Sequence, residues 1–292
     1  PRPAVRWVGG VTDGTYAAVG QHLKGLSSTL EAYKSWFFAD DSVVCLGAGI
    51  TARDGVPVET VVDHRPLGAD GDPRLTVDGG AGHEGVLHGV RWAHLEGHGG
   101  WVFPGGAELG VLRESRTGAW RDINAAGSAL PLTRRFLTLW HPHGTDPVSG
   151  SYAYVLMPGA SRAEVAARAA DGDRLTVLAN SAACQAVRLG PPGVLAANFL
   201  RAGTVAGLTV SAPASVLVRR CGRRAVLHLS EPPRTGAPVE LTWDRPVRRV
   251  LAHDASVRVR GTGAALRLTV VPGTACASHR CEVELGPPAV KL

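Results

Sequence analysis

Cysteine is scarce in this sequence, with five residues in 292, at positions 45, 184, 221, 276 and 281. Five cysteines are too few for a fold built on disulfides, and they lie too far apart for a zinc ribbon. Cys276 with Cys281, and Cys184 with Cys221, are open pairings that would leave Cys45 as an apolar core residue. The core must therefore come from side-chain packing.

Long apolar runs are also lacking. No stretch reaches the roughly 18 uninterrupted apolar residues of a membrane helix, so no membrane partner is expected. The opening Pro1-Arg2-Pro3 has the form of neither an initiator nor a signal peptide. This start predicts a mature or truncated product, and no secretion signal can be read from it.

Runs of Lys or Arg are missing too, although the formal net charge is +6 and the isoelectric point is about 9.4. The positive charge makes an acidic polysaccharide or a nucleic acid a sensible partner, or it only steers anions weakly to the surface. Nucleic acid is the least favoured partner, because the basic residues lack interleaved aromatics and any recognition motif.

Glycine and proline are plentiful, with 37 and 20 residues, and Val- and Thr-rich runs lie between them. This pattern predicts an all-β fold of short strands joined by turns. Residues 21–33 are expected to form a loop, and separate strands are expected before and after Pro104-Gly105-Gly106. One short helix is predicted within residues 160–172, with Ser161 as N-cap and Glu164 completing a capping box.

The length leaves room for two domains of moderate size. Residues 1–201 are predicted to form a large antiparallel β-sandwich and residues 202–292 a smaller C-terminal β-sandwich. Since no long linker separates them, the two sandwiches are expected to pack against each other.

Several segments occur in the order found in secreted polysaccharide lyases that cleave hyaluronan, chondroitin or xanthan, known as polysaccharide lyase family 8. They are Gly9-Gly10-Val11, Gly14-Thr15-Tyr16, Lys34–Ile50, Val58–Arg65, Leu75–Gly79, Arg116–Asn124, Leu137–Gly144, Tyr152–Gly159 and Val177-Leu178-Ala179-Asn180. The chain resembles the central β-domain of that family, with a supersandwich-like fold, followed by its C-terminal domain. The resemblance implies an extracellular location.

In this family a preceding helical toroid carries the Asn, His and Tyr that neutralise the uronate carboxylate and move the C5 proton. The resemblance therefore places no catalytic residue on this chain, requires a missing N-terminal helical domain as partner and implies no cofactor. It leaves open whether the chain alone is an enzyme. The four tyrosines are expected to be packing residues; they are Tyr16, Tyr33, Tyr152 and Tyr154.

One short segment combines guanidinium groups, an aromatic surface and an amide, which together suit an acidic sugar chain. The predicted substrate-binding residues, expected in a loop between strands, are Arg113, Glu114, Arg116, Trp120, Arg121 and Asn124. The alternative is that Trp120 and Asn124 order the loop while the arginines remain solvated.

Other candidates are weaker. His141 and His143 alternate on one strand face, but no nearby Cys or carboxylate completes a metal site. Asp70-Gly71-Asp72 is predicted to be a turn and not a calcium loop. Glu59 is expected to pair across strands or with Arg65.

The sequence thus favours the β-sheet portion of an extracellular lyase that cleaves uronic-acid-containing glycans by β-elimination. That portion is expected to be inactive without the helical domain. The alternative is a stand-alone module that binds acidic carbohydrate or has a structural role.

Overall fold

The computed structural model describes residues 4–68, 72–191 and 193–287. Antiparallel strands dominate this part of the chain, which confirms the predicted all-β fold. The chain divides into two compact units: residues 1–54, 147–153 and 171–292 form unit 1, and residues 55–146 and 154–170 form unit 2. The predicted turn at Asp70-Gly71-Asp72 lies mostly outside the described residues.

Unit 1 begins with four strands in a meander: β1 (Val8–Thr12), β2 (Ala17–Lys24), β3 (Glu31–Phe38) and β4 (Val43–Thr51). The loop predicted over residues 21–33 is wrong except at its centre, since β2 and β3 occupy both of its ends. Polar side chains stabilise this hairpin: His22 Nε2 lies 2.7 Å from Glu31 Oε1, and the ring of His22 stacks on Tyr33. Polar composition therefore concealed two paired strands.

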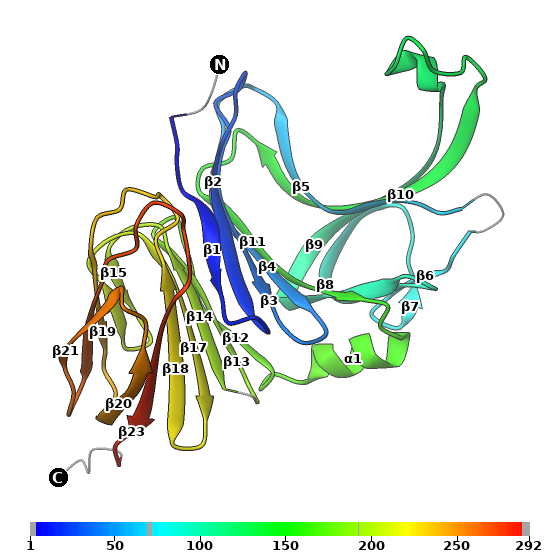
Figure 1. The fold of residues 1–292 in the computed structure, drawn as a ribbon. Coiled ribbons are helices and arrows are strands. Elements are labelled where there is room, and N and C mark those ends of the chain that lie inside the picture. The colour runs from blue at the N-terminus through cyan, green and yellow to red at the C-terminus, as the bar shows by residue number, and fades with distance from the viewer. Residues whose placement is uncertain (1–3, 69–71, 192, 288–292) are drawn as a thin grey trace. The chain divides into compact units, whose positions relative to one another are not determined.

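Two further sheets of unit 1 form a β-sandwich, at the lower left of Figure 1. In the described residues, the first has seven strands in the order β12 (Leu175–Asn180), β13 (Cys184–Leu189), β14 (Val194–Phe199), β17 (Ala214–Cys221), β18 (Arg224–Ser230), β23 (His279–Leu285) and β20 (Val247–His253). The second has β15 (Gly203–Val205), β16 (Leu208–Val210), β19 (Val239–Trp243), β22 (Leu266–Val270) and β21 (Val257–Gly261). Apolar side chains such as Phe199, Leu227 and Trp243 fill the space between the sheets.

The meander packs on the outer face of the seven-stranded sheet through a buried polar network. Ser35 donates to Gln185 at 2.5 Å, and Asn198 Nδ2 donates to Ser35 at 3.0 Å. Trp7 Nε1 donates to the carbonyl of Phe199 at 3.1 Å. Such bonds offset the cost of burying polar groups and fix the register of the two layers.

The predicted boundary between residues 201 and 202 falls between β14 and β15, where the chain passes from one sheet of the sandwich to the other. It stays a prediction.

Unit 2 is built on long strands: β5 (Pro57–Pro66), β8 (Gly85–Leu95), β9 (Gly99–Gly118) and β10 (Leu132–Thr145), with the short β6 (Leu75–Val77) and β7 (Gly80–Ala81). It also holds the second half of β11 (Gly150–Pro158). The turn predicted at Gly105-Gly106 is wrong, because both glycines take φ near +80° inside the continuous strand β9. Left-handed glycines bend a strand without ending it. Buried Trp101, Phe103 and Leu139 form part of its core.

Helix α1 (Arg162–Ala170) contacts β8 and β9 of unit 2 and buries Val165 completely. The predicted capping box is confirmed. The Ser161 backbone N–H donates to Glu164 Oε2 at 2.7 Å, and the Glu164 backbone N–H donates to Ser161 Oγ at 3.3 Å. None of the helices in the described ranges has the length and apolar character needed to cross a membrane.

Candidate functional site

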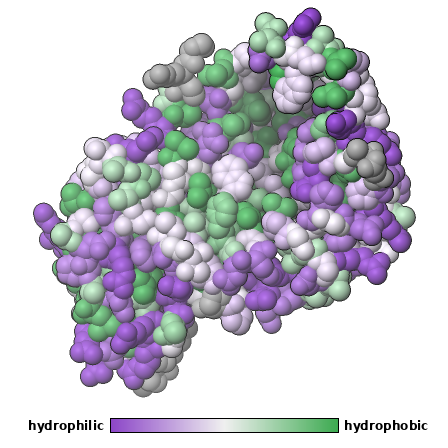
Figure 2. All heavy atoms as spheres, turned by 45° about the vertical axis from the view of Figure 1, so that its right-hand side comes forward, coloured by the Kyte–Doolittle hydropathy of each residue, from purple (hydrophilic) through white to green (hydrophobic). Residues whose placement is uncertain are grey.

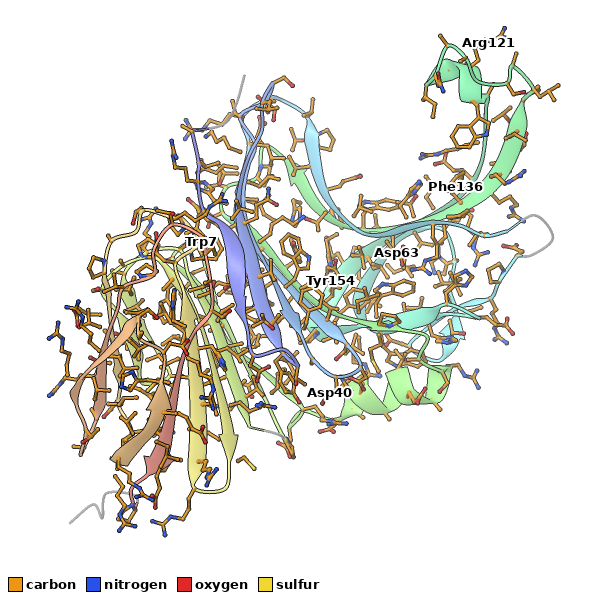
Figure 3. The ribbon with its side chains drawn as sticks, in the orientation of Figure 1. Trp7, Asp40, Asp63, Arg121, Phe136 and Tyr154 are labelled. Atoms are coloured by element: carbon orange, nitrogen blue, oxygen red, sulfur yellow. The ribbon has the colours of Figure 1, made fainter. Side chains whose placement is uncertain are left out.

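The end of the β9–β10 hairpin forms an arm of unit 2, which we define as residues 112–138 (Figure 1). The two strands stay paired from Leu112–Thr138 to Gly118–Leu132, and residues 119–131 form the tip with the short 3₁₀-helix η1 (Trp120–Asp122). Figure 3 shows Phe136 in the arm and Arg121 at its tip. Three of the predicted site residues, Arg113, Glu114 and Arg116, therefore lie in a strand and not in the expected loop.

Strand alternation divides the arm into two faces, because successive side chains point to opposite sides. One face, which we call the binding face, carries Glu114 opposite Phe136 and Arg116 opposite Arg134. The other face carries Arg113 and Arg135, and both ion-pair with Asp72. Arg113 also donates to the carbonyl of Pro73 at 2.8 Å. Arg113 thus fastens the arm to the preceding loop and does not face the same side as Arg116.

Hydrogen bonds within the tip hold its shape. The Asn124 carboxamide accepts from the backbone N–H of Ala126 at 3.1 Å, and Asp122 accepts from the N–H of Ala119 at 2.7 Å. The backbone N–H of Asn124 donates to the carbonyl of Trp120 at 2.9 Å. The side chain of Asn124 therefore orders the loop, as the alternative interpretation of the sequence expected for this residue.

A hollow of about 330 Å³ opens beside η1 and the binding face. Its lining consists of Arg116, Thr117, Gly118, Ala119, Trp120, Asp122, Ile123, Leu132, Arg134 and Phe136. Trp120 is 59 % exposed and Ile123 is 79 % exposed, so both present apolar surface to solvent beside the hollow. Figure 2 shows hydrophobic residues, in green, among hydrophilic ones at the top of the molecule, where the arm ends.

Two arginines, Arg116 and Arg134, lie on this face together with the carboxylate of Glu114, and Asp122 also lines the hollow. Arg116 donates to Glu114 Oε1 at 2.8 Å and stacks 5.7 Å from the centre of the Phe136 ring. Arg134 donates to the carbonyl of Thr133 at 2.9 Å, and it forms no ion pair within the described ranges. Glu114 already offsets the charge of Arg116, whereas Arg134 lies directly opposite with no carboxylate partner in the described ranges, so a bound anion would pair with Arg134.

The structure therefore brings Arg116 and Trp120 of the predicted set together in one hollow, with Glu114 held on Arg116. Arg121 lies at the tip, outside the residues that line the hollow. Sequence reasoning missed Arg134, Phe136 and Ile123. The alternation of Leu132, Arg134 and Phe136 along one strand would have placed them on one face, but the register against β9 could not be derived from the sequence.

The two strand histidines have hydrogen-bond partners in the protein. His141 Nδ1 lies 3.1 Å from the Glu108 carbonyl oxygen, and His143 Nε2 lies 2.8 Å from Thr60 Oγ1. Burial, and then the neighbouring His141, lowers the pKa of His143 to about 4. In the described part of the chain, no group of three or more His, Cys, Asp or Glu side chains is arranged to hold a metal ion.

Two tyrosines of unit 1, Tyr16 and Tyr152, have pKa values above the usual value for a phenol. Burial raises the pKa of Tyr152 far above its usual value. Burial and a hydrogen bond of 2.9 Å to Asp40 raise the pKa of Tyr16. A phenol that holds its proton this firmly is poorly suited to act as a general base.

Neither of the cysteine pairings that the sequence left open is formed, and Arg65 does not take the Glu59 partner that was one of its alternatives. All five cysteines, which lie within the described ranges, are free thiols, so neither Cys276 with Cys281 nor Cys184 with Cys221 is bridged. Arg65 binds Asp63, with Nε 3.0 Å from Oδ2, and not Glu59. Residues two apart share one strand face, which brings these two side chains together.

Comparison with known proteins shows which family two segments of the chain match. Residues 2–169 match the profile of the polysaccharide lyase family 8 super-sandwich domain, and residues 176–240 match the profile of the C-terminal β-sandwich domain of that family. The hyaluronate lyase of Thermasporomyces composti is 48 % identical over 289 residues, covering 97 % of this chain and 37 % of the relative. The chain thus spans little more than a third of that relative's length.

Solved structures agree. The chondroitin AC lyase of Streptomyces coelicolor, determined in complex with chondroitin sulphate, is 59 % identical with a TM-score of 0.88, covering 98 % of this chain and 37 % of that one. A Paenibacillus xanthan lyase is 30 % identical with a TM-score of 0.94, covering 99 % of this chain and 30 % of that one. The super-sandwich match covers more than half of the 292 residues, and the order of the two domains is that of the family. The chain belongs to polysaccharide lyase family 8.

Proposed function

We propose that this chain is the β-sheet portion of an extracellular lyase that cleaves a uronic-acid-containing glycan of the hyaluronan, chondroitin or xanthan type by β-elimination. Relatives named as hyaluronate, xanthan and chondroitin AC lyases support the substrate class. The helical domain implied by the family resemblance would supply the groups that act on the C5 proton. These 292 residues alone are then expected to bind glycan without cleaving it.

Within this proposal the binding face of the arm holds the acidic chain. The observation that carries it is the placement of Arg116 directly opposite Arg134 beside exposed Trp120 and the ring of Phe136. Guanidinium groups donate in a planar fork that matches a carboxylate or a sulfate, and an aromatic face provides an apolar surface for a sugar ring. Charge and apolar surface are thus available on one face.

The first experiment measures ultraviolet absorbance from the C4–C5 double bond when the purified chain meets hyaluronan, chondroitin or xanthan, with glycan binding measured by calorimetry on the same sample. Binding without product is the expected result. Product formation would show that a base lies on this chain, and the absence of binding to all three glycans would contradict the proposed role of the arm.

Variants locate the binding. Arg134→Gln is expected to weaken glycan binding about tenfold, because it removes charged hydrogen bonds. Arg135→Gln changes the net charge equally, but Arg135 lies on the opposite face and contacts Asp72, so it serves as the matched control. Equal losses in the two variants would indicate general charge attraction and not a site.

The second candidate is a stand-alone module that binds acidic carbohydrate or has a structural role. The same exposed Trp120 and paired arginines favour it, since they need no catalytic partner. Adding a purified family 8 helical domain distinguishes the two functions: gain of cleavage supports the lyase portion, and unchanged binding without cleavage supports the module. DNA that bound as tightly as hyaluronan, with the same salt dependence, would contradict both.

A further inference from the structure

A second, smaller hollow of about 90 Å³ lies in the C-terminal sandwich, far along the sequence from the arm. Its lining consists of Arg188, Gly193, Val194, Leu195, Ala206, Val218, Arg220, Trp243 and Arg245. These residues come from both sheets, at the end of the sandwich where β17 turns into β18 (lower left in Figure 1). All of them belong to unit 1.

Strand register places two of the arginines on the inner face of the seven-stranded sheet. Arg188 of β13 is directly opposite Leu195 of β14, which in turn is opposite Val218 of β17. Val218 is 1 % exposed and packs in the core between the sheets, and Arg220 follows it by two residues on the same face. Both arginines therefore lie on this face of the sheet at the ends of their strands, and their side chains, like that of Arg245, are exposed to solvent at the mouth of the hollow.

The third arginine comes from the other sheet. Arg245 follows β19, and its backbone N–H donates to the carbonyl of Trp243 at 2.8 Å. The adjacent turn between β15 and β16 holds Ala206 and Gly207 at φ of 49° and 83°, which lets this edge turn tightly. Trp243, only 2 % exposed, closes the apolar floor.

None of the three arginines forms an ion pair in the described part of the chain, although other arginines of this sandwich do. Arg219 Nε lies 2.9 Å from Asp13 Oδ2, and Arg249 Nε lies 2.8 Å from Glu284 Oε2. Arg248 is also paired with Glu284, at 3.3 Å. Three cations around one partly enclosed hollow repel each other, and the repulsion is relieved when an anion lies between them.

We propose that this hollow is a binding site for an oxyanion, a sulfate or carboxylate group, held by Arg188, Arg220 and Arg245. Its volume suits a single oxyanion and not a sugar ring, so the group would enter from a chain lying across the mouth or as a free ion. Guanidinium groups match both anions by paired N–H donors. The site stands on its own charge and shape, so it does not depend on the proposed function of the arm.

The test titrates the chain with sodium sulfate by calorimetry, against sodium chloride at matched ionic strength. Arg220→Gln is expected to bind sulfate at least about tenfold more weakly, because charged hydrogen bonds are lost. Arg248→Gln is the matched control: it removes the same charge from an exposed arginine of the same sandwich that already has Glu284 as partner. Arg220→Lys should restore part of the affinity.

A second arm of the experiment identifies the source of the anion. Affinity for a chondroitin sulfate oligosaccharide is measured in protein that carries Arg134→Gln, which disables the arm, with and without Arg220→Gln. If Arg220→Gln lowers this affinity, the anion in the hollow belongs to the glycan. If the hollow binds sulfate but Arg220→Gln leaves the oligosaccharide affinity unchanged, the anion is a free ion. The proposal is overturned if sulfate binds no better than chloride, or if Arg220→Gln and Arg248→Gln bind it equally. Loss of glycan binding in Arg134→Gln with unchanged sulfate binding separates the two sites.

Discussion

The ring of Tyr152 lies directly against Gly47: a Cβ on Gly47 would come within 2.0 Å of Cε1 of that ring. Gly47→Ala is therefore expected to lower the free energy of unfolding by about 1–3 kcal/mol, as overpacking does. Urea unfolding followed by fluorescence measures it. Gly203→Ala is the control, because no atom lies within 4 Å of a Cβ there and its φ is not left-handed. Equal effects of both changes would contradict this contact.

The tyrosine and the glycine show what the sequence could and could not supply. Strand segments, turns and the capping box of Ser161 and Glu164 follow from local patterns, so the all-β fold and the single α-helix in the described ranges were predictable. The contact between Gly47 and Tyr152 joins residues 105 positions apart in sequence, and only the folded chain brings them together.

The candidate site was predictable in part for the same reason. The arginines and Trp120 are close in sequence, so composition alone marked the segment. The two faces of the arm depend on the register of β9 against β10, which sets Arg116 opposite Arg134 and turns Arg113 toward Asp72. A one-residue change of register would exchange the faces, and no local pattern fixes it.

Acid is expected to destabilise unit 2 through His143. Its pKa is lowered from 6.5 to about 4, so between these values the unfolded chain binds a proton that the folded chain does not, and stability falls as the pH decreases through this window. His143→Gln retains a hydrogen-bonding group for Thr60 and should flatten that dependence. Urea midpoints between about pH 4 and 7 measure it. The exposed His83, changed to Gln, serves as control, and an unchanged slope in His143→Gln would contradict the assignment.

Alkaline stability should depend on Lys34. Burial lowers the pKa of this amine below 10.5, so the unfolded chain binds more protons in the window just below 10.5, and stability rises with pH there. Lys34→Met removes the cost of burying the charge and should raise the urea midpoint at neutral pH, with a gain that shrinks toward pH 10.5. Lys24→Met is the comparison, since Lys24 is exposed and pairs with Glu31 at 3.0 Å, and it should give no gain.

Thiol labelling should distinguish the cysteines. Burial raises the pKa of Cys184 to about 12 and that of Cys281 to about 11, which keeps both protonated and unreactive at neutral pH. Cys221 is exposed and should react first with iodoacetamide, as mass spectrometry of peptides would show. Labelling of all five after denaturation without a reductant is expected, and any disulfide-linked peptide would contradict the free thiols.

Substitutions of two residues of the predicted site are expected to change different properties: glycan affinity for Arg116 and the order of the tip for Asn124. Arg116→Gln removes a charge from the lining of the hollow, so glycan affinity should fall about tenfold while the urea midpoint stays within experimental error. Asn124→Ala removes the acceptor for the N–H of Ala126, so hydrogen exchange within residues 119–131 should quicken.

The contrast rests on where each side chain bonds. Arg116 keeps its strand pairing with Arg134 whatever its side chain, because that pairing uses backbone groups, whereas the side chain of Asn124 accepts a hydrogen bond that shapes the tip. Calorimetry with a hyaluronan oligosaccharide and exchange measured by mass spectrometry on both variants test it. Faster hydrogen exchange at the tip in Arg116→Gln would show that Arg116 orders the arm. The loss of glycan affinity in this variant would then not indicate a direct contact between Arg116 and the glycan.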